Sequence, residues 1–401
     1  MTEKTTTELR VAWIAQGRLF VQTDGQPLQE IESEFARQSQ QRNLRDSELN
    51  AWKGRSGVWG NLGMQPPGAA PWEDQDPQRQ IRFVAVARGP TADEIFYVLD
   101  MGTVGGLFCY NLKEHTERRL VHRQGFVLKD VSRHSADGEL AVSLPRDDGT
   151  IGLKITRHDG LFGHAITMSD SLDESPAWLP DGSKRLVFQS SAIGRDEHGY
   201  AIGQSPFRIE KLDLATKEVT AVFEEEGYDL LQPRILSDDS LICIRRPHQA
   251  MQRPQLSFSQ YLQDVVLFPY RLLRTFVHFF HFMSMMFTGK PLISAGGPVN
   301  RRRKANPYLM LWGQAIDTHR ILSRERSDGP RTPLVPDEWK LMRRDANGMQ
   351  SVLADNVLAW DLCADESVCY TDGRRVYHRP VTGSPRVVAE ADLIERVAVL
   401  S

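Results

Sequence analysis

A short motif built around a Pro-Asp-Gly turn constrains the fold of this chain more than any other feature. The sequence Ser175-Pro176-Ala177-Trp178-Leu179-Pro180-Asp181-Gly182 precedes the apolar segment Arg185-Leu186-Val187-Phe188. Proline fixes φ at the first central position of a turn, and Asp and Gly tolerate the left-handed φ that closes a hairpin. The motif therefore predicts two antiparallel strands, one ending at Trp178 and the other running from Arg185 to Phe188.

The same turn recurs along the chain, each time before an alternating apolar segment. Equivalent aspartates are Asp93, Asp137, Asp181, Asp238 and, in a degenerate last copy, Asp365. The first three are spaced by 44 residues, and a second hairpin, such as Phe207–Asp213 with Val219–Phe223, completes each unit. Four short strands in a period of about 40–45 residues are typical of a propeller blade.

The two ends of the chain carry strands that lack partners in their own unit. Three strands are predicted near the start, at Arg10–Ala15, Gly17–Gln22 and Pro27–Ile31, and one at the end, at Arg396–Leu400. If the last strand completes the first sheet, the ring closes and no edge is left for aggregation. The sequence thus predicts an all-β protein: one β-propeller domain, 1–401, with six four-stranded blades, ring closure by the C-terminal strand and a helical insertion on one face.

The motif with Pro176, Trp178, Pro180, Asp181 and Gly182 resembles the Pro-Asp-Gly propeller repeat of TolB-type proteins, over 80–245 and 338–400. This resemblance implies a propeller fold and no specific activity, because the residues of the motif are structural. Members of the family are mostly binding platforms or the gate domain of a peptidase.

Composition and charge favour a soluble globular protein without a general affinity for nucleic acid. Hydrophobic residues make up 40% of the chain and charged residues 25%, with a formal net charge of −3. The four cysteines form no Cys-x-x-Cys pair, which favours small buried hydrophobic side chains in a reducing compartment. The first eight residues lack the apolar segment of a secretory signal, so we expect a cytoplasmic location, unlike that of periplasmic TolB.

Two long segments interrupt the repeat. The first, 32–78, begins with a helix-compatible stretch and continues as a Trp-, Pro- and Gly-rich loop between blades. Its tryptophans either pack onto the propeller or form a contact surface with a partner, and the sequence favours neither. The residues concerned are Trp52, Trp59 and Trp72.

The second interruption, 246–337, contains an apolar segment, 268–288, predicted to be a helix. Its polar residues Arg271, Arg274, His278 and His281 follow helical spacing and form one narrow stripe. Two arginines near the middle disfavour a transmembrane span. Burial against the protein or a partner is the leading interpretation, and association with an acidic membrane surface, aided by Arg301–Lys304, is the alternative. The residues predicted to contact a partner are Arg271, Arg274, Phe279, Phe280, Phe282 and Met286.

No catalytic, cofactor-binding or metal-binding motif is present in the sequence. It contains no Gly-x-Ser-x-Gly elbow, phosphate-binding loop or dinucleotide fingerprint, and His278 and His281 lack further ligands nearby. Asp130, Asp173 and Asp229 recur near the starts of innermost strands. They could ring the central channel and bind a cation or a basic peptide, or they could accept bonds from loop N–H groups.

The sequence therefore predicts a non-catalytic interaction platform within a larger protein assembly. In a four-stranded blade the second-to-third loops and the blade connections emerge on the same face, so both long interruptions are expected there. We expect protein partners on that face, with no nucleic acid, no cofactor and no small-molecule substrate. The alternatives are a propeller associated with the inner membrane surface, and a hydrolase or lyase with a carboxylate-lined channel.

Overall fold

The structure is a computed structural model, and it describes residues 8–42, 45, 81–102, 104–124, 128–157, 162–249, 308–311, 313–317 and 332–400. The chain divides into two compact units, the first comprising 1–250 and 319–401 and the second 251–318. In the second unit, β19 (Tyr308–Leu311) and β20 (Gln314–Asp317) form an antiparallel hairpin. This hairpin was not predicted from the sequence.

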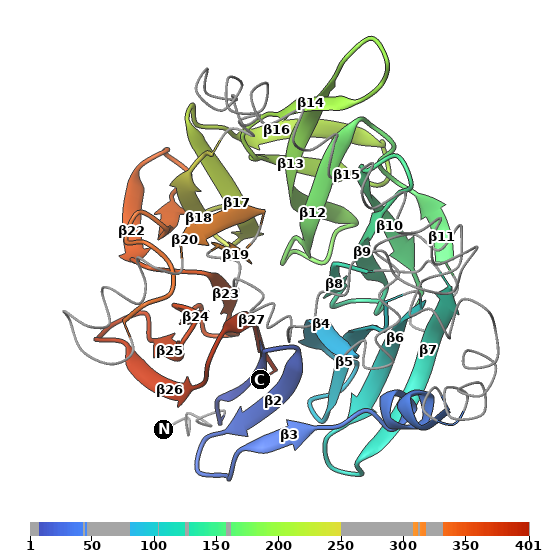
Figure 1. The fold of residues 1–401 in the computed structure, drawn as a ribbon. Coiled ribbons are helices and arrows are strands. Elements are labelled where there is room, and N and C mark those ends of the chain that lie inside the picture. Colours follow the sequence, from blue (N-terminus) through green and yellow to red (C-terminus); the bar gives the residue numbers. More distant parts are fainter. Residues whose placement is uncertain are drawn as a thin grey trace, which may run out of the picture. The chain divides into compact units, whose positions relative to one another are not determined.

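The first unit is built of antiparallel four-stranded sheets arranged around a common axis (Figure 1). We name each sheet after its innermost strand. The β4 sheet comprises β4 (Arg82–Arg88), β5 (Glu94–Asp100), β6 (Val104–Asn111) and β7 (Thr116–Gln124). The β8 sheet comprises β8 (Asp130–Arg133), β9 (Leu140–Pro145), β10 (Ile151–Thr156) and β11 (Phe162–Ala165). One parallel pair, Ile151 with Leu172, joins it to the next sheet.

That next sheet, the β12 sheet, comprises β12 (Ser171–Trp178), β13 (Arg185–Arg195), β15 (Arg208–Asp213) and β16 (Glu218–Phe223), and β14 (Ala201–Gln204) extends β13 as a hairpin. The β17 sheet comprises β17 (Tyr228–Ile235), β18 (Leu241–Pro247), β21 (Lys340–Arg344) and β22 (Gln350–Ala354). The β23 sheet comprises β23 (Ala359–Leu362), β24 (Val368–Thr371), β25 (Arg375–Arg379) and β26 (Arg386–Glu390). The predicted count of six blades stays a prediction, whereas the β-propeller fold is confirmed.

The remaining sheet joins the two ends of the chain. Its order is β27 (Ile394–Val399), β1 (Arg10–Ala15), β2 (Arg18–Thr23) and β3 (Gln29–Ile31). Strand β27 pairs with β1 from Val399 opposite Val11 to Ile394 opposite Ala15. The predicted closure by the C-terminal strand is therefore confirmed, and we call this sheet the closing sheet.

The recurrent turns adopt the conformation that their residues predict. Gly138 and Gly182 have φ values of 75° and 71°. Where the glycine is missing, Asp239 and Glu366 take the left-handed conformation instead, with φ of 60° and 64°. The repeated turns share a backbone shape because the aspartate of each turn accepts the N–H two residues further on. These aspartates are Asp137, Asp181, Asp238 and Asp365.

Apolar side chains pack between neighbouring sheets. One cluster joins the closing sheet to the β4 sheet through Ile14, Leu19, Tyr97 and Phe108, all fully buried. The four cysteines are free thiols and buried, as predicted for small hydrophobic side chains. Because each sheet packs through both of its surfaces, the innermost strands are held at fixed positions around the axis.

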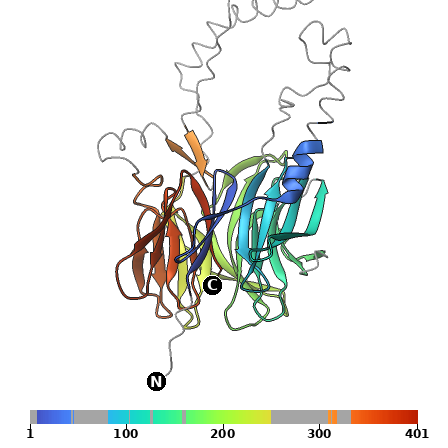
Figure 2. The same ribbon diagram turned by 90° about the horizontal axis from the view of Figure 1, so that it is seen from below.

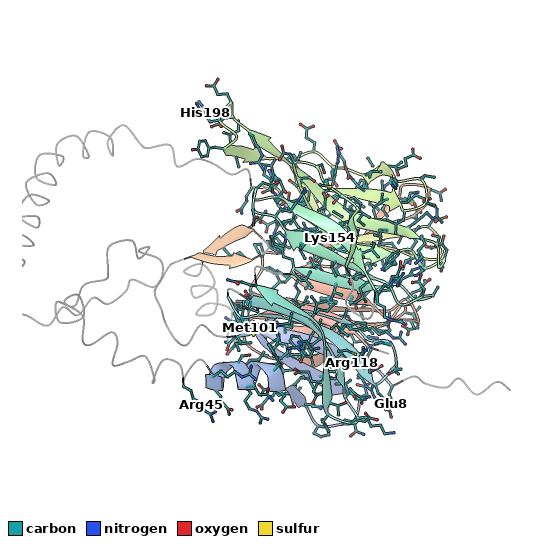
Figure 3. The ribbon with its side chains drawn as sticks, turned by 90° about the vertical axis from the view of Figure 1, so that its right-hand side faces the viewer. Glu8, Arg45, Met101, Arg118, Lys154 and His198 are labelled. Carbon is teal, nitrogen blue, oxygen red and sulfur yellow. The ribbon has the colours of Figure 1, made fainter. Side chains whose placement is uncertain are left out.

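The turns after the first and third strands of each sheet lie on one face of the first unit, which we call the turn face. The opposite face, the connection face, carries the links between sheets and the second-to-third loops. Figure 3 shows Arg45, Met101 and His198 toward the connection face and Glu8 toward the turn face. Among the described residues, the short turns therefore lie on one face and the longer connections on the other, as the sequence predicts.

A short helix, 34–42, follows β3 on the connection face (Figure 2). The Ser33 hydroxyl accepts the Ala36 N–H at 3.1 Å, as an N-cap does. The Glu117 carboxylate of β7 accepts the N–H groups of Glu34 and Phe35 at 3.0 and 3.2 Å. These contacts attach the start of the 32–78 segment to the β4 sheet.

The other sequence predictions for the two interruptions lie outside the described residues. They concern the helix 268–288, the basic run Arg301–Lys304 and every predicted partner-binding residue, namely Trp52, Trp59, Trp72, Arg271, Arg274, Phe279, Phe280, Phe282 and Met286. The parts of the chain that the structure does describe contain no helix long and apolar enough to cross a membrane.

Candidate functional site: the channel cavity

A cavity of about 740 Å³ lies between the innermost strands and reaches the turn face. Each of the strands β4, β8, β12, β17, β23 and β27 contributes to its wall. The wall also includes turn residues at the ends of these strands, among them Pro90, Ser135, Pro180 and Ala364. The volume is in the range of ligand-binding pockets.

A series of hydrogen bonds from side chain to backbone links neighbouring sheets around this cavity. Asp130 accepts the Ser175 N–H at 3.3 Å, and Asp361 accepts the Val399 N–H at 2.9 Å. Between them, Gln189 accepts the Gln232 N–H at 2.8 Å, and Gln232 accepts the Trp360 N–H at 3.2 Å. Polar side chains on the inner strands, and Gln189 on the second strand of its sheet, therefore hold the ring together, because they satisfy N–H groups that the sheets themselves leave unpaired.

Local irregularities in two inner strands turn two of these N–H groups, those of Ser175 and Gln232, toward their acceptors. Ser175 and Gln232 have φ of 52° and 51°, and each precedes a proline. The pairing register shifts at both positions, between Glu174 and Ala177 in β12 and between Leu231 and Arg234 in β17. Such bulges turn a backbone group out of its own sheet, here toward the preceding one.

Two arginine–aspartate pairs cross the inner part of the cavity. Arg396 of β27 donates to Asp130 at 2.6 Å and to the Lys129 carbonyl at 3.1 Å. Arg234 of β17 lies 3.5 Å from Asp361. Both carboxylates that line the cavity are thus engaged by a cation and by a backbone N–H, which leaves them poorly placed to act as acid, base or metal ligand.

Two further arginines line the cavity without a partner. Arg88 and Arg133 are the last residues of β4 and β8, which are neighbouring inner strands. Within the described part of the chain, neither guanidinium has a hydrogen bond or ion pair, and the buried Nε of Arg133 is unsatisfied. The charged residues of the described wall are therefore Arg88, Arg133, Arg234 and Arg396 against Asp130 and Asp361, an excess of two positive charges.

Four aspartates of the surrounding turns do not cancel this excess, because each already has a cation. Asp93 pairs with Arg10 at 3.1 Å and Asp238 with Arg343 at 2.6 Å, while Asp137 pairs with Lys184 and Asp181 with Arg185. Burial would raise the pKa of Asp137, but hydrogen bonds from Lys184 and His134 outweigh it and hold that pKa well below its usual range. Hydrogen bonds from Ser183 lower the pKa of Asp181 to about 2.

At the connection face the inner strands begin in a different environment. Asp229 is 2% exposed and accepts from the Phe207 N–H at 3.1 Å, from Arg246 Nε at 3.1 Å and from His248 Nδ1 at 2.7 Å. Asp173 accepts from the Ser190 hydroxyl at 2.8 Å. Of the three recurrent aspartates, only Asp130 lines the cavity.

The prediction that these aspartates accept backbone N–H groups is therefore correct for Asp130 and Asp229, and the channel position is correct, of the three, for Asp130 alone. The described residues contain no group of three or more His, Cys, Asp or Glu side chains that could hold a metal ion. Sequence reasoning missed Arg88 and Arg133. The sequence contained a signal for Arg133. Arg133 and Arg234 both stand four residues before the aspartate of the following turn, and this shared position could have indicated that both line the cavity.

Comparisons with known proteins support the fold. No family model and no curated sequence matches this chain. The structure is similar to TolB from Acinetobacter baumannii, with a TM-score of 0.50 and 11% identity over 98% of this chain. The chain described here spans 66% of the length of that TolB chain. A chain of the nidogen/laminin complex also has a TM-score of 0.50, with 6% identity and 98% of each chain covered. The protein has a TolB-like β-propeller fold, and these identities show the fold alone.

Proposed function

We propose that this protein is a non-catalytic binding platform, a subunit of a larger protein assembly, and that a segment of a partner protein docks in the channel cavity from the turn face. The observation that carries this proposal is the cavity itself, whose wall is formed by the ends of inner strands from every sheet around it. Binding sites are commonly placed where a rigid scaffold presents turns and strand ends around a concavity.

The state of the cavity carboxylates supports binding rather than catalysis. A hydrolase or lyase needs a carboxylate that is free to exchange a proton with its substrate. Asp130 and Asp361 instead accept backbone N–H groups from the next sheet and face arginines. Their removal would disturb the ring, which is the behaviour of structural residues.

Partner binding through the connection face, and association with a membrane surface, rest on the residues of 32–78 and 246–337 named above. Both ideas stay predictions, as does the cytoplasmic location. The turn-face proposal differs from them in placing the partner on the opposite face, so the two are separable by substitution.

A bulky substitution at the mouth of the cavity tests the proposal. Ser135 is exposed at the rim, and Ser135→Trp would obstruct the entrance. Thr216→Trp is the matched control, because Thr216 is an exposed residue of a third-to-fourth-strand turn on the same face and does not line the cavity. We expect proteins that co-purify with the wild type to be lost with Ser135→Trp and kept with Thr216→Trp. Retention by both variants would refute docking in the cavity.

A further inference from the structure

We infer that the occupant of the channel cavity is an acidic segment of a partner protein, whose carboxylates are bound by Arg88 and Arg133. This inference rests on the proposed function and names the chemistry of the ligand. It arises from the two guanidinium groups at the mouth of the cavity that have no partner among the described residues.

The first step of the argument concerns the unsatisfied groups. A guanidinium has five N–H donors in a planar fork that matches a carboxylate, and such charge-assisted bonds are about twice as strong as neutral ones. The Nε of Arg133 is buried without an acceptor, and a buried donor left unpaired is costly. An incoming carboxylate would supply the missing acceptor.

The second step concerns competing charges within the protein. The turn carboxylates that could fold over onto Arg88 or Arg133 are held elsewhere: Asp93 by Arg10 and Asp137 by Lys184 and His134. The deeper arginines, Arg234 and Arg396, face Asp361 and Asp130. The field at the mouth is therefore positive, and an anionic ligand gains from it without displacing an internal partner.

The third step separates a protein segment from a small anion. Beyond Arg88 and Arg133 the wall continues inward through small apolar residues, including Ala85, Ala87, Val131, Val397 and Ala398. A free phosphate would leave this apolar surface uncovered. A chain segment that carries acidic and apolar side chains would use both the arginines and the inner wall, in a volume that admits several residues.

The test measures binding of a fluorescein-labelled eight-residue peptide of alternating Glu and Val to the full chain, by fluorescence anisotropy. The comparison peptide replaces each Glu by Gln. At about 50 mM salt we expect the acidic peptide to bind at least tenfold more tightly, and its affinity to fall as salt is raised, because exposed charges are then screened.

Variants show whether the two arginines are responsible. Arg88→Gln combined with Arg133→Gln should weaken binding of the acidic peptide at least tenfold. The control combines Arg157→Gln with Lys113→Gln, which removes the same charge from exposed residues at third-to-fourth-strand turns of the same face. It should change affinity less than twofold. The Arg88 and Arg133 variants should melt within about 2 °C of the wild type, since neither side chain contacts another described residue through a polar group.

Three results would overturn the inference: equal affinity for the acidic and Gln peptides, an equal loss in the Arg88/Arg133 and control variants, or inorganic tripolyphosphate binding as tightly as the peptide. The third result would identify a small anion as the ligand. Partners that Ser135→Trp removes but the Arg88/Arg133 variant retains would overturn the acidic segment and leave the proposed function standing. Partners unaffected by either change would overturn both.

Discussion

The two ends of the inner strands use charge in opposite ways. Where the strands begin, Asp229 lies buried and accepts bonds from Arg246, His248 and a backbone N–H. Where the strands end, Arg88 and Arg133 line a cavity and lack a partner among the described residues. At the first end the charge is enclosed and compensated, and at the second it is left open to a ligand.

Under the proposed function, this difference separates residues that stabilise the fold from residues that bind a partner. A buried ion pair that loses one member leaves an uncompensated charge, which strongly destabilises the fold. A half-exposed arginine without a partner contributes little to folding and remains available for a ligand. Arg396 combines the two features, because it pairs with Asp130 and also lines the cavity.

The largest effect is expected at the buried end. Asp229→Ala removes the acceptor for Arg246, His248 and the Phe207 N–H, and should lower the free energy of unfolding by about 3–5 kcal/mol. Asp229→Asn keeps an acceptor of the same shape and should cost less. Urea denaturation of the two variants measures this. A loss below about 1 kcal/mol for the alanine variant would show that this end is no more structural than the cavity.

An intermediate effect is expected in the middle of the channel. Arg396→Met deletes the bonds to Asp130 and to the Lys129 carbonyl, and should lower the free energy of unfolding by about 1–3 kcal/mol. Arg82→Met is the matched control, because Arg82 is more exposed and lies 3.5 Å from its partner Glu395, and it should cost under about 1 kcal/mol. Equal losses of stability for Arg396→Met and Arg82→Met, in thermal or urea melts, would mean that burial does not decide how much these arginines stabilise the fold.

The smallest effect is expected at the turn face and depends on pH. The pKa of Asp137 is held below its ordinary value of 3.8, so its ion pair stabilises the fold above about pH 4, and this contribution is lost as pH falls through the folded-state value. Asp137→Asn should therefore lower stability by under about 1 kcal/mol at pH 7, with a difference that shrinks in acid. When Lys184 is replaced by Met, Asp137→Asn should lower the free energy of unfolding by less than it does in the wild type, because Lys184 pairs with Asp137. A difference that grew below pH 4 would contradict this assignment.

Much of the fold was predictable because its signals are local. The Pro-Asp-Gly turn and its degenerate copies keep the same backbone shape, and Asp239 and Glu366 adopt left-handed φ where glycine is missing. Side-chain alternation marks the strands, and the unpartnered strand at the chain end predicted the pairing of β27 with β1. These features depend on a few consecutive residues, or on one missing partner.

The candidate site was not predictable in the same way. Asp130, Asp173 and Asp229 look equivalent in the sequence, yet only Asp130 lines the cavity. The contact between Arg396 and Asp130 joins residues 266 positions apart. Whether a charge is neutralised or left open depends on which distant side chains the closed ring brings within hydrogen-bond distance.

By itself, then, the sequence determined the repeating unit, the strands and the closure of the ring, because turn chemistry and alternation act over a few residues. Only the tertiary structure decided that the cavity wall carries an excess of positive charge at the turn face. The physical reason is that an ion pair forms only when the folded chain brings the two charged groups within about 4 Å of each other. Arg10 reaches Asp93 across 83 positions of the chain, whereas Arg88, five residues from Asp93, does not pair with it.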